Sequence, residues 1–401
     1  MQKGYLFISN STKPSKEAVN NRAPISLSNF SRWPIEYAIQ HGYKVYMGTN
    51  RNNAEELCSV EGYDITFYDQ HSYRSIFALK DNWIAFKNLR NLLKLHPEIE
   101  LIHCNTPIGG MVGRICGKLY GVKTVIYTAH GFHFYKGAPL FNRTVLKWME
   151  KLMARWTDAI LTMNQEDYQA AQKFHIRNHG KVYFVPGVGV DSKSFDEISV
   201  DRKEVRTSLG LTEDDVVAIA MGDIVLRKNY RTSIQAVAKA NRPNLHYIIC
   251  GLGNQTEELK KYSEELGIAH KIHFLGFRKD IKQLALSSDL FLFSSTQEGL
   301  PRSTMEAMCA GIPCVISKIR GHVDLIENEK GGLLCPVTDA DAFSNALQRM
   351  VDDSDFRLSQ GKIAKERIKR FDIEVVRKRI CEIYDDILVS AQNDVLTNST
   401  N

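Results

Sequence analysis

Short apolar runs rich in β-branched residues alternate with longer amphipathic stretches along most of the chain. Most of these runs are apolar almost throughout, which is typical of strands buried on both faces of a parallel sheet. The stretches between them have the apolar spacing of helices, so the pattern predicts repeated strand–helix units. The predicted strands are residues 4–9, 44–49, 64–69, 101–105, 123–128, 159–163, 181–185, 216–221, 246–250, 271–275, 290–293, 314–317 and 332–335.

The series of strands is interrupted once, at the sequence PGVGVDSKSF of residues 186–195, where Gly, Pro and polar residues cluster. The 401 residues are also too many for one hydrophobic core. We therefore predict an α/β protein with two doubly wound domains. The predicted parts are a first domain of residues 1–190, a second domain of residues 191–370, a C-terminal helix of residues 371–390 that packs back on the first domain, and a disordered tail of residues 391–401.

Composition and charge narrow the class of protein. The chain is 43% hydrophobic and 24% charged, as soluble globular proteins are. The formal net charge of +6 is too small to argue for a nucleic-acid partner. No apolar run approaches the roughly 20 residues that a membrane span needs, and the apolar stretch near the N-terminus is shorter than that of a signal peptide. We expect a cytoplasmic protein.

The segment with the most chemical information is SSTQEGLPRSTMEAMCAGIPCVIS, residues 294–317. A buried strand leads into a loop with Glu298 and Gly299, and Pro301 suits the first turn of a following helix that contains Glu306. The N-terminus of a helix offers N–H groups to a phosphate. The two carboxylates can accept hydrogen bonds from sugar hydroxyls on either side of it, although carboxylates at this spacing also occur by chance on surfaces.

Further candidates follow other predicted strands. Arg227 and Lys228 lie on the loop GDIVLRKN, where adjacent cations can neutralise a leaving diphosphate or remain a solvated pair. His130 ends a strand and precedes a glycine, a position that suits a site in an open α/β sheet. Asn105 and Asn164 also end strands, where each could be a turn residue or face a binding cleft.

These segments resemble the family 4 retaining glycosyltransferases of the GT-B fold. The similarity lies in TAHGFHF, PGVGVDSKSF, GDIVLRKN, GFRKDI and the EGLPRSTMEAMCAG segment, in this order, and it covers about residues 1–390. It implies two Rossmann-like domains that face a cleft, with the acceptor on the first and the donor on the second. The implied activity moves a sugar from a nucleotide-diphosphate donor to a saccharide acceptor that is lipid-linked, in polysaccharide or glycan synthesis.

The resemblance also implies roles for individual residues. His130 would contact the donor sugar near the reacting carbon, Lys228 would clamp the diphosphate, and Arg278 would help to frame the base. Many relatives have a basic residue directly after the glycine of the GDIVLRKN loop, where this chain has Asp223. The residues predicted to act in catalysis are His130, Lys228 and Glu298. Those predicted to bind the donor are Arg227, Arg278, Gly299, Leu300 and Glu306.

Donor and cofactor are expected from the resemblance alone. UDP is the favoured nucleotide, and an N-acetylhexosamine or another hexose is the favoured sugar. Asp339 and Asp341 spell a DxD triplet of the kind that can bind a metal, but Asp339 also suits the N-cap of a helix. We expect no metal and no other cofactor, with a front-face displacement in which the departing diphosphate helps to deprotonate the acceptor.

A basic helix is predicted over residues 139–158. Its cations recur every four residues and share one face, beside two tryptophans. Such a face suits an anionic membrane surface or a lipid diphosphate, and it equally suits a solvated side of a core helix. The first interpretation predicts a peripheral membrane protein. The four cations are Arg143, Lys147, Lys151 and Arg155.

Three other functions are weighed against this interpretation. An NAD-dependent hydride transferase would need a glycine-rich turn after the first strand, and the turn ISNSTKPSKE contains no glycine. A non-hydrolysing sugar-nucleotide epimerase shares the GT-B layout and is the main alternative. A non-catalytic sugar-binding module would not need a cation loop and a helix N-terminus directed at one diphosphate.

Overall fold

The computed structural model describes residues 2–9, 27, 29–49, 62–73 and 75–398. The chain divides into two compact units. Unit 1 comprises Met1–Gly189 and Val376–Asn401, and unit 2 comprises Val190–Val375. Most of the glycine-free turn predicted after the first strand lies outside the described residues.

Unit 1 is built on one parallel sheet of seven strands, in the order β3-β2-β1-β4-β5-β6-β7. The order reverses between β1 and β4, as in a doubly wound fold. In the central strands of the sheet nearly all side chains are buried, because helices cover both faces. The strands are β1 (Gly4–Ile8), β2 (Lys44–Thr49), β3 (Ile65–Asp69), β4 (Ile99–Asn105), β5 (Thr124–Ala129), β6 (Ala159–Thr162) and β7 (Lys181–Phe184).

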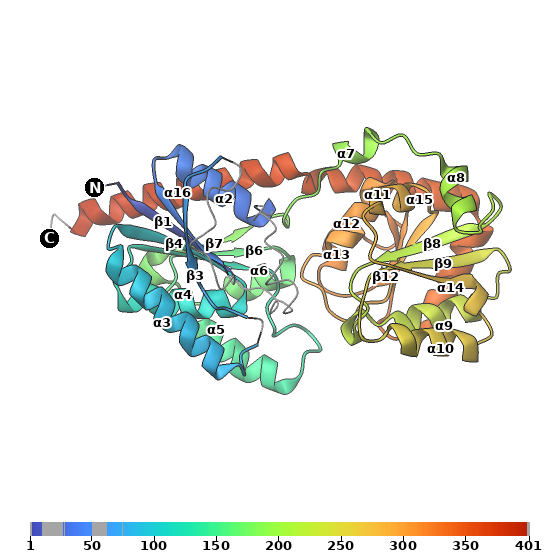
Figure 1. Cartoon of the computed structure of the whole chain (residues 1–401), viewed down its shortest axis with the longest axis horizontal. Helices are drawn as coiled ribbons and strands as arrows, with labels where there is room; N and C mark the ends of the chain where they lie inside the picture. The colour runs from blue at the N-terminus through green and yellow to red at the C-terminus, as the bar shows by residue number, and fades with distance from the viewer. Residues whose placement is uncertain (1, 10–26, 28, 50–61, 74, 399–401) are drawn as a thin grey trace. The chain divides into compact units, whose positions relative to one another are not determined.

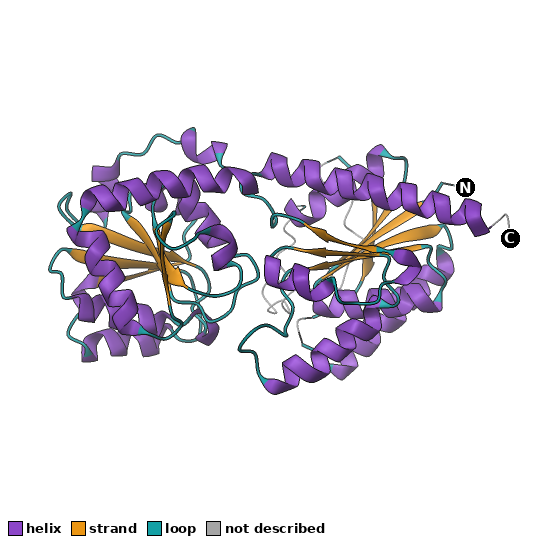
Figure 2. Ribbon diagram, turned by 180° about the vertical axis from the view of Figure 1, so that it is seen from behind, coloured by secondary structure: helices purple, strands orange, loops and turns teal. Residues whose placement is uncertain are grey.

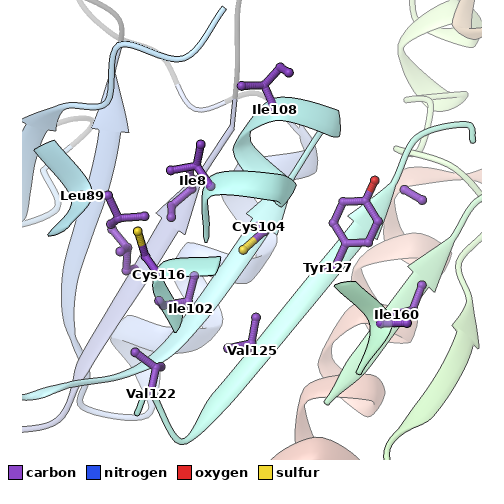
Figure 3. Close-up of a cluster of buried hydrophobic side chains, with 14 of the residues drawn as sticks. Ile8, Leu89, Ile102, Cys104, Ile108, Cys116, Val122, Val125, Tyr127 and Ile160 are labelled. Carbon is purple, nitrogen blue, oxygen red and sulfur yellow. The ribbon is translucent and has the colours of Figure 1, made fainter. Parts of the chain in front are cut away.

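Helices of unit 1 lie on the two sides of this sheet (Figure 1). α2 (Asn29–Gln40) and α16 (Ile373–Asn398) pack on one face. The other face carries α3 (Leu79–Leu95), α4 (Pro107–Leu119) and α5 (Lys147–Ala154). Figure 3 shows how apolar side chains of α4 meet those of the strands beneath it. Shorter helices are α6 (Gln165–Ala171) and the 3₁₀ turn η3 (Arg177–His179).

Unit 2 repeats the plan with six parallel strands in the order β10-β9-β8-β11-β12-β13. In Figure 1, α9, α10 and α14 cover one side of this sheet and α11, α12 and α15 the other. Figure 2 shows the same layers from behind. The strands are β8 (Val216–Met221), β9 (Leu245–Cys250), β10 (Ile272–Gly276), β11 (Leu290–Phe293), β12 (Cys314–Ser317) and β13 (Gly332–Cys335). The helices are α7 (Lys193–Asp196), α8 (Arg202–Ser208), η4 (Leu226–Lys228), α9 (Tyr230–Ala240), α10 (Thr256–Glu265), η5 (Ala269–Lys271), α11 (Ile281–Leu286), α12 (Arg302–Cys309), α13 (His322–Leu325), α14 (Ala340–Asp352), α15 (Ser354–Ile368) and η6 (Lys369–Phe371).

The predicted fold class is confirmed, because every predicted strand is present and both sheets are doubly wound. Two predicted elements need correction. The tail of residues 391–401 was expected to be disordered, whereas α16 continues to Asn398, since no Gly or Pro interrupts it. The helix expected over residues 139–158 begins at residue 140, contains a π-helical turn, η2 (Asn142–Leu146), and continues as α5 to Ala154.

Candidate functional site

The point where the strand order of unit 2 reverses holds a buried ion pair. β8 and β11 are hydrogen-bonded neighbours, and ligands of open α/β sheets bind beyond the carboxyl ends of such strands. The loop after β8 places Lys228 in η4, and the loop after β11 carries Glu298. Lys228 Nζ donates to Glu298 Oε1 at 2.7 Å, and each side chain is about nine-tenths buried. Two segments 70 residues apart in sequence therefore meet at the predicted donor site.

Glu298 is held by several further groups. Ser295 Oγ donates to Oε1 at 2.7 Å, and the half-exposed Arg227 lies 3.4 Å from the same oxygen. Arg320 Nε donates to the backbone carbonyl of Glu298 at 3.1 Å. Burial alone would raise the pKa of the Glu298 carboxyl, but the charge and hydrogen bond of Lys228 bring it below its usual value. Glu298 is therefore an oriented carboxylate, and its Oε2 accepts no hydrogen bond from the described part of the chain.

Gly251 and Gly253, which follow β9, have a packing role. A Cβ atom on Gly251 would lie 1.9 Å from the carbonyl oxygen of Gly222, and one on Gly253 would lie 2.0 Å from that of Ile224. The backbone of the loop after β9 thus packs directly against the backbone of the loop that leads to Lys228. Glycine is required because two backbones meet there.

The other predicted donor residues lie around the pair in different ways. Gly299 and Leu300 connect Glu298 to α12, while Glu306 sits within α12 and is paired with Arg302 at 2.9 Å. Among the described residues no contact joins Glu306 to the Lys228–Glu298 pair. Arg278 is paired with Asp280, and this pairing raises the pKa of its guanidinium. These residues remain predictions as donor ligands.

His322 is a group at this site that sequence analysis missed. It follows β12, and its Nδ1 lies 2.8 Å from the carbonyl oxygen of Ser317, while the hydroxyl of Ser317 donates to the carbonyl of Ser295. Burial lowers the pKa of His322 to about 4, so the ring is neutral at physiological pH. The signal in the sequence was weaker than that for His130, because His322 lies five residues after the end of β12 and not at the end of a strand.

In unit 1, His130 and Asn105 lie together at the carboxyl edge of the sheet. His130 Nε2 and Asn105 Oδ1 are 3.1 Å apart. Burial lowers the pKa of His130 to about 4, so this imidazole is neutral as well. Asn105 is 1% exposed, and its Nδ2 has no hydrogen-bond partner within the described ranges. A small pocket lies beside Asn105 and is lined in part by His103, Thr128 and Ile380.

Asn164 has a structural role. Its Oδ1 accepts from the backbone N–H of Asp167 at 2.9 Å, and its Nδ2 donates to the Asp167 carboxylate at 2.8 Å. It is the N-cap of α6 and fully buried, a role that differs from both the turn residue and the cleft residue considered in the sequence.

A second network missed by sequence analysis links α16 to the sheet of unit 1. His103 Nδ1 lies 2.7 Å from Tyr384 Oη, and His103 Nε2 lies 2.7 Å from Thr128 Oγ1. Tyr384 Oη is also 3.0 Å from Tyr5 Oη. Burial lowers the pKa of His103 to about 3 and raises that of both tyrosines, so all three groups are neutral. A side chain of α16 thus contacts His103, which lines the small pocket beside Asn105.

The DxD triplet has ordinary partners. Asp339 is the N-cap of α14 and accepts from Ala342 N at 2.9 Å, and Asp341 is paired with Lys239 at 2.6 Å. Within the residues that the structure describes, no group of three or more His, Cys, Asp or Glu side chains is arranged to hold a metal ion. No described helix is both long and apolar enough to cross a membrane.

Known proteins match both units of the chain. The family model "Glycosyl transferases group 1" matches residues 201–367, and the model "Glycosyltransferase Family 4" matches residues 35–191. The putative glycosyltransferase EpsD of Bacillus subtilis is 30% identical over 309 residues, which are 76% of this chain and 80% of that protein. An Escherichia coli enzyme named UDP-Gal:alpha-D-GlcNAc-diphosphoundecaprenol alpha-1,3-galactosyltransferase is 28% identical over 347 residues, covering 83% of this chain and 89% of that one.

Solved structures show the same fold. The crystal structure of Anabaena HepE in complex with UDP and glucose superposes with a TM-score of 0.74 at 20% identity, covering 96% of this chain and all of that one. This likeness shows the GT-B fold, and the sequence matches show that the chain belongs to the family 4 glycosyltransferases.

Proposed function

We propose that this glycosyltransferase takes an N-acetylhexosamine or another hexose from a UDP-sugar and transfers it, with retention of configuration, to a lipid-linked saccharide. The observation that carries the proposal is the Lys228–Glu298 pair beyond the carboxyl ends of β8 and β11. It offers a cation for the diphosphate and an oriented carboxylate for the sugar at one place. The UDP in the HepE complex and the UDP-sugar in the name of the Escherichia coli enzyme support the choice of nucleotide.

In the proposed reaction, the acceptor hydroxyl oxygen forms a bond to C1 of the donor sugar on the face where the bond to the diphosphate oxygen breaks. The hydroxyl proton passes to the departing diphosphate. Lys228 Nζ donates one hydrogen bond to Glu298 and has two further N–H groups for the phosphate oxygens. Glu298 Oε2 can accept from a sugar hydroxyl. His130, neutral at physiological pH, is the proposed contact near the reacting carbon.

The lipid-linked acceptor is supported by the diphosphoundecaprenol acceptor in the name of the Escherichia coli relative. We also propose that the cationic side of η2 and α5 contacts an anionic membrane surface. Arg143, Lys147, Lys151 and Arg155 are all exposed, and the only acidic residue between positions 139 and 155, Glu150, points inward to an arginine. Such a surface suits anionic headgroups.

Thermal-shift measurements with UDP-, GDP- and ADP-sugars test the donor. A ligand that binds only the folded state raises the midpoint of unfolding, so UDP-sugars should raise it most. Product formed on a short-chain lipid diphosphate saccharide should carry the α configuration of the donor in its NMR coupling constants. Stabilisation by GDP- or ADP-sugars alone would overturn the choice of base, and a β-linked product would overturn retention.

Metal removal should leave activity unchanged. The proposed charge stabilisation comes from Lys228, Arg227 and the N–H groups that begin α12, so no step needs a divalent cation. Initial rates with excess EDTA should equal those with added magnesium. A rate that collapses in EDTA and returns with magnesium or manganese would refute this, and the variant Asp339→Asn would then show whether the DxD triplet is responsible.

A further inference from the structure

Asn105 ends β4 at a turn whose backbone is strained. Thr106, the next residue, has φ 67° and ψ 163°, a region of backbone space that only glycine normally occupies. Two constraints account for this conformation. Pro107 keeps the residue before it extended, and α4 has to begin against the end of β1, where a Cβ atom on Gly109 would lie 3.0 Å from the backbone of Ser9. The abrupt turn after Asn105 is therefore imposed by its surroundings.

Asn105 and His130 lie on the same face of the sheet of unit 1. In the register of β4 and β5, Asn105 is paired with Thr128, and His130 follows Thr128 by two residues. Successive side chains of a strand point to opposite faces, so residues two apart share a face. His130 comes directly after the last residue of β5, and its Nε2 lies 3.1 Å from Asn105 Oδ1. The register of the two strands therefore brings these side chains together.

The contact with Asn105 defines the state of the His130 ring. An amide oxygen can only accept a hydrogen bond, so the ring nitrogen beside it, Nε2, carries the proton. Burial lowers the pKa of His130 to about 4, so at physiological pH the ring holds one proton and its Nδ1 is an acceptor. His103, whose ring acts on that of His130, is neutral too, because burial lowers its pKa to about 3. A neutral acceptor nitrogen suits a hydroxyl group and disfavours a phosphate oxygen.

The position of Asn105 costs stability. The side chain is buried, and its Nδ2 has no hydrogen-bond partner among the described residues. A buried amide N–H without a partner is unfavourable, and the strained backbone of Thr106 adds to this cost. Costs of this kind persist where the geometry itself is needed, and they gather at functional sites. The two observations together indicate that Asn105 is placed for its contact with His130.

We propose that Asn105 is a positioning residue for His130: its amide oxygen, held by the strained turn at Thr106, fixes the ring with Nε2 protonated and Nδ1 as the acceptor. In the proposed reaction this acceptor meets a hydroxyl of the donor sugar near the reacting carbon. The inference rests on the proposed function for the role of His130 in turnover. The effect of Asn105 on the ring itself does not depend on which donor binds.

Two variants of similar size test the contact, assayed with the UDP-sugar that raises the unfolding midpoint most. Asn105→Leu removes the acceptor and should lower kcat by about tenfold, the effect of one hydrogen bond. Asn105→Asp keeps the acceptor and adds a charge that should raise the pKa of His130 by about one unit or more. Its rate should match wild type at alkaline pH and fall as the pH drops through this raised pKa, because the protonated ring has no acceptor. Wild type should keep its rate over the same range, since its His130 stays neutral.

Thr106→Gly tests the strained turn. Glycine adopts this backbone conformation freely, so the unfolding midpoint should not fall, whereas kcat should fall severalfold because Asn105 is no longer held. Full activity of Thr106→Gly would overturn the part assigned to the turn. Thr128→Val is the matched control: this buried residue lies on the same face, and its loss breaks the 2.7 Å contact with His103 but leaves the Asn105–His130 contact intact. It should keep the rate and the pH profile of wild type.

The variant His130→Ala tells failure of this inference from failure of the proposed function. If His130→Ala is as active as wild type, the proposed role of His130 is wrong, whatever the Asn105 variants do. If His130→Ala loses most of its activity while Asn105→Leu keeps the wild-type rate, only the positioning role is wrong. NMR of the histidine ring protons adds a measurement that needs neither donor nor acceptor: an unchanged pKa of His130 in Asn105→Asp would also overturn the positioning role.

Discussion

Lys228→Ala should lower turnover by about 100-fold or more, as for the loss of one charged donor at a transition state. Lys228 Nζ is the buried cation at the strand-order reversal. Its loss also leaves the buried Glu298 carboxylate without the ion pair at 2.7 Å. The charge that develops on the departing diphosphate would then face a carboxylate whose remaining ion-pair partner is Arg227, 3.4 Å away. Steady-state kinetics with a UDP-sugar should show the loss mainly in kcat, since the charge builds during the reaction.

Two further variants serve as comparisons for Lys228→Ala. Lys228→Arg keeps the charge but not the compact ammonium, and should recover only part of the rate. Lys239→Ala removes an exposed lysine of the same unit and should leave kinetics unchanged, because its partner Asp341 is a surface residue. Turnover of Lys228→Ala within a few-fold of wild type, with an intact fold by circular dichroism, would remove Lys228 from the diphosphate site.

Glu150→Ala should destabilise unit 1 by about 3–5 kcal/mol, since it leaves a buried cation unpaired. Arg114 of α4 is wholly buried, and its Nη1 donates to Glu150 Oε2 of α5 at 2.9 Å. Its guanidinium also stacks on Tyr127, 3.8 Å from the ring centroid, and its Nε donates to the carbonyl of Gly110. Once Glu150 is lost, neither contact compensates for the charge of Arg114. Chemical denaturation followed by circular dichroism measures the difference.

The double variant Arg114→Met, Glu150→Leu separates charge from packing. Replacing both members of a buried ion pair by apolar residues of similar size often costs little, so it should be more stable than Glu150→Ala. Lys123→Ala breaks a surface pair with Glu100 and should cost less than about 1 kcal/mol. A Glu150→Ala protein as stable as the Lys123→Ala protein would show that Arg114 finds another partner or reaches water.

The parallel sheets could be predicted from the sequence because each strand is an apolar run long enough to be buried on both faces. The capping role of Asn164 could not be predicted, since an asparagine at the end of a strand fits a turn and a cleft equally. The spacing of residues in the sequence does not predict contacts between distant positions. Lys228 and Glu298 are 70 residues apart, and His103 and Tyr384 are 281 apart. For these, only the order of the strands in the folded sheet decides which loops meet.

The path of the chain also determines the order in which the two units can fold during synthesis. Unit 2 lies between two parts of unit 1, whose last segment begins at Val376. On a ribosome, unit 2 therefore emerges complete while unit 1 still lacks α16. Until α16 arrives, Tyr5 and His103 lack the hydroxyl of Tyr384. Nascent chains thus expose an apolar face of the first sheet until α16 has been synthesised, and a premature stop between unit 2 and α16 leaves that face open.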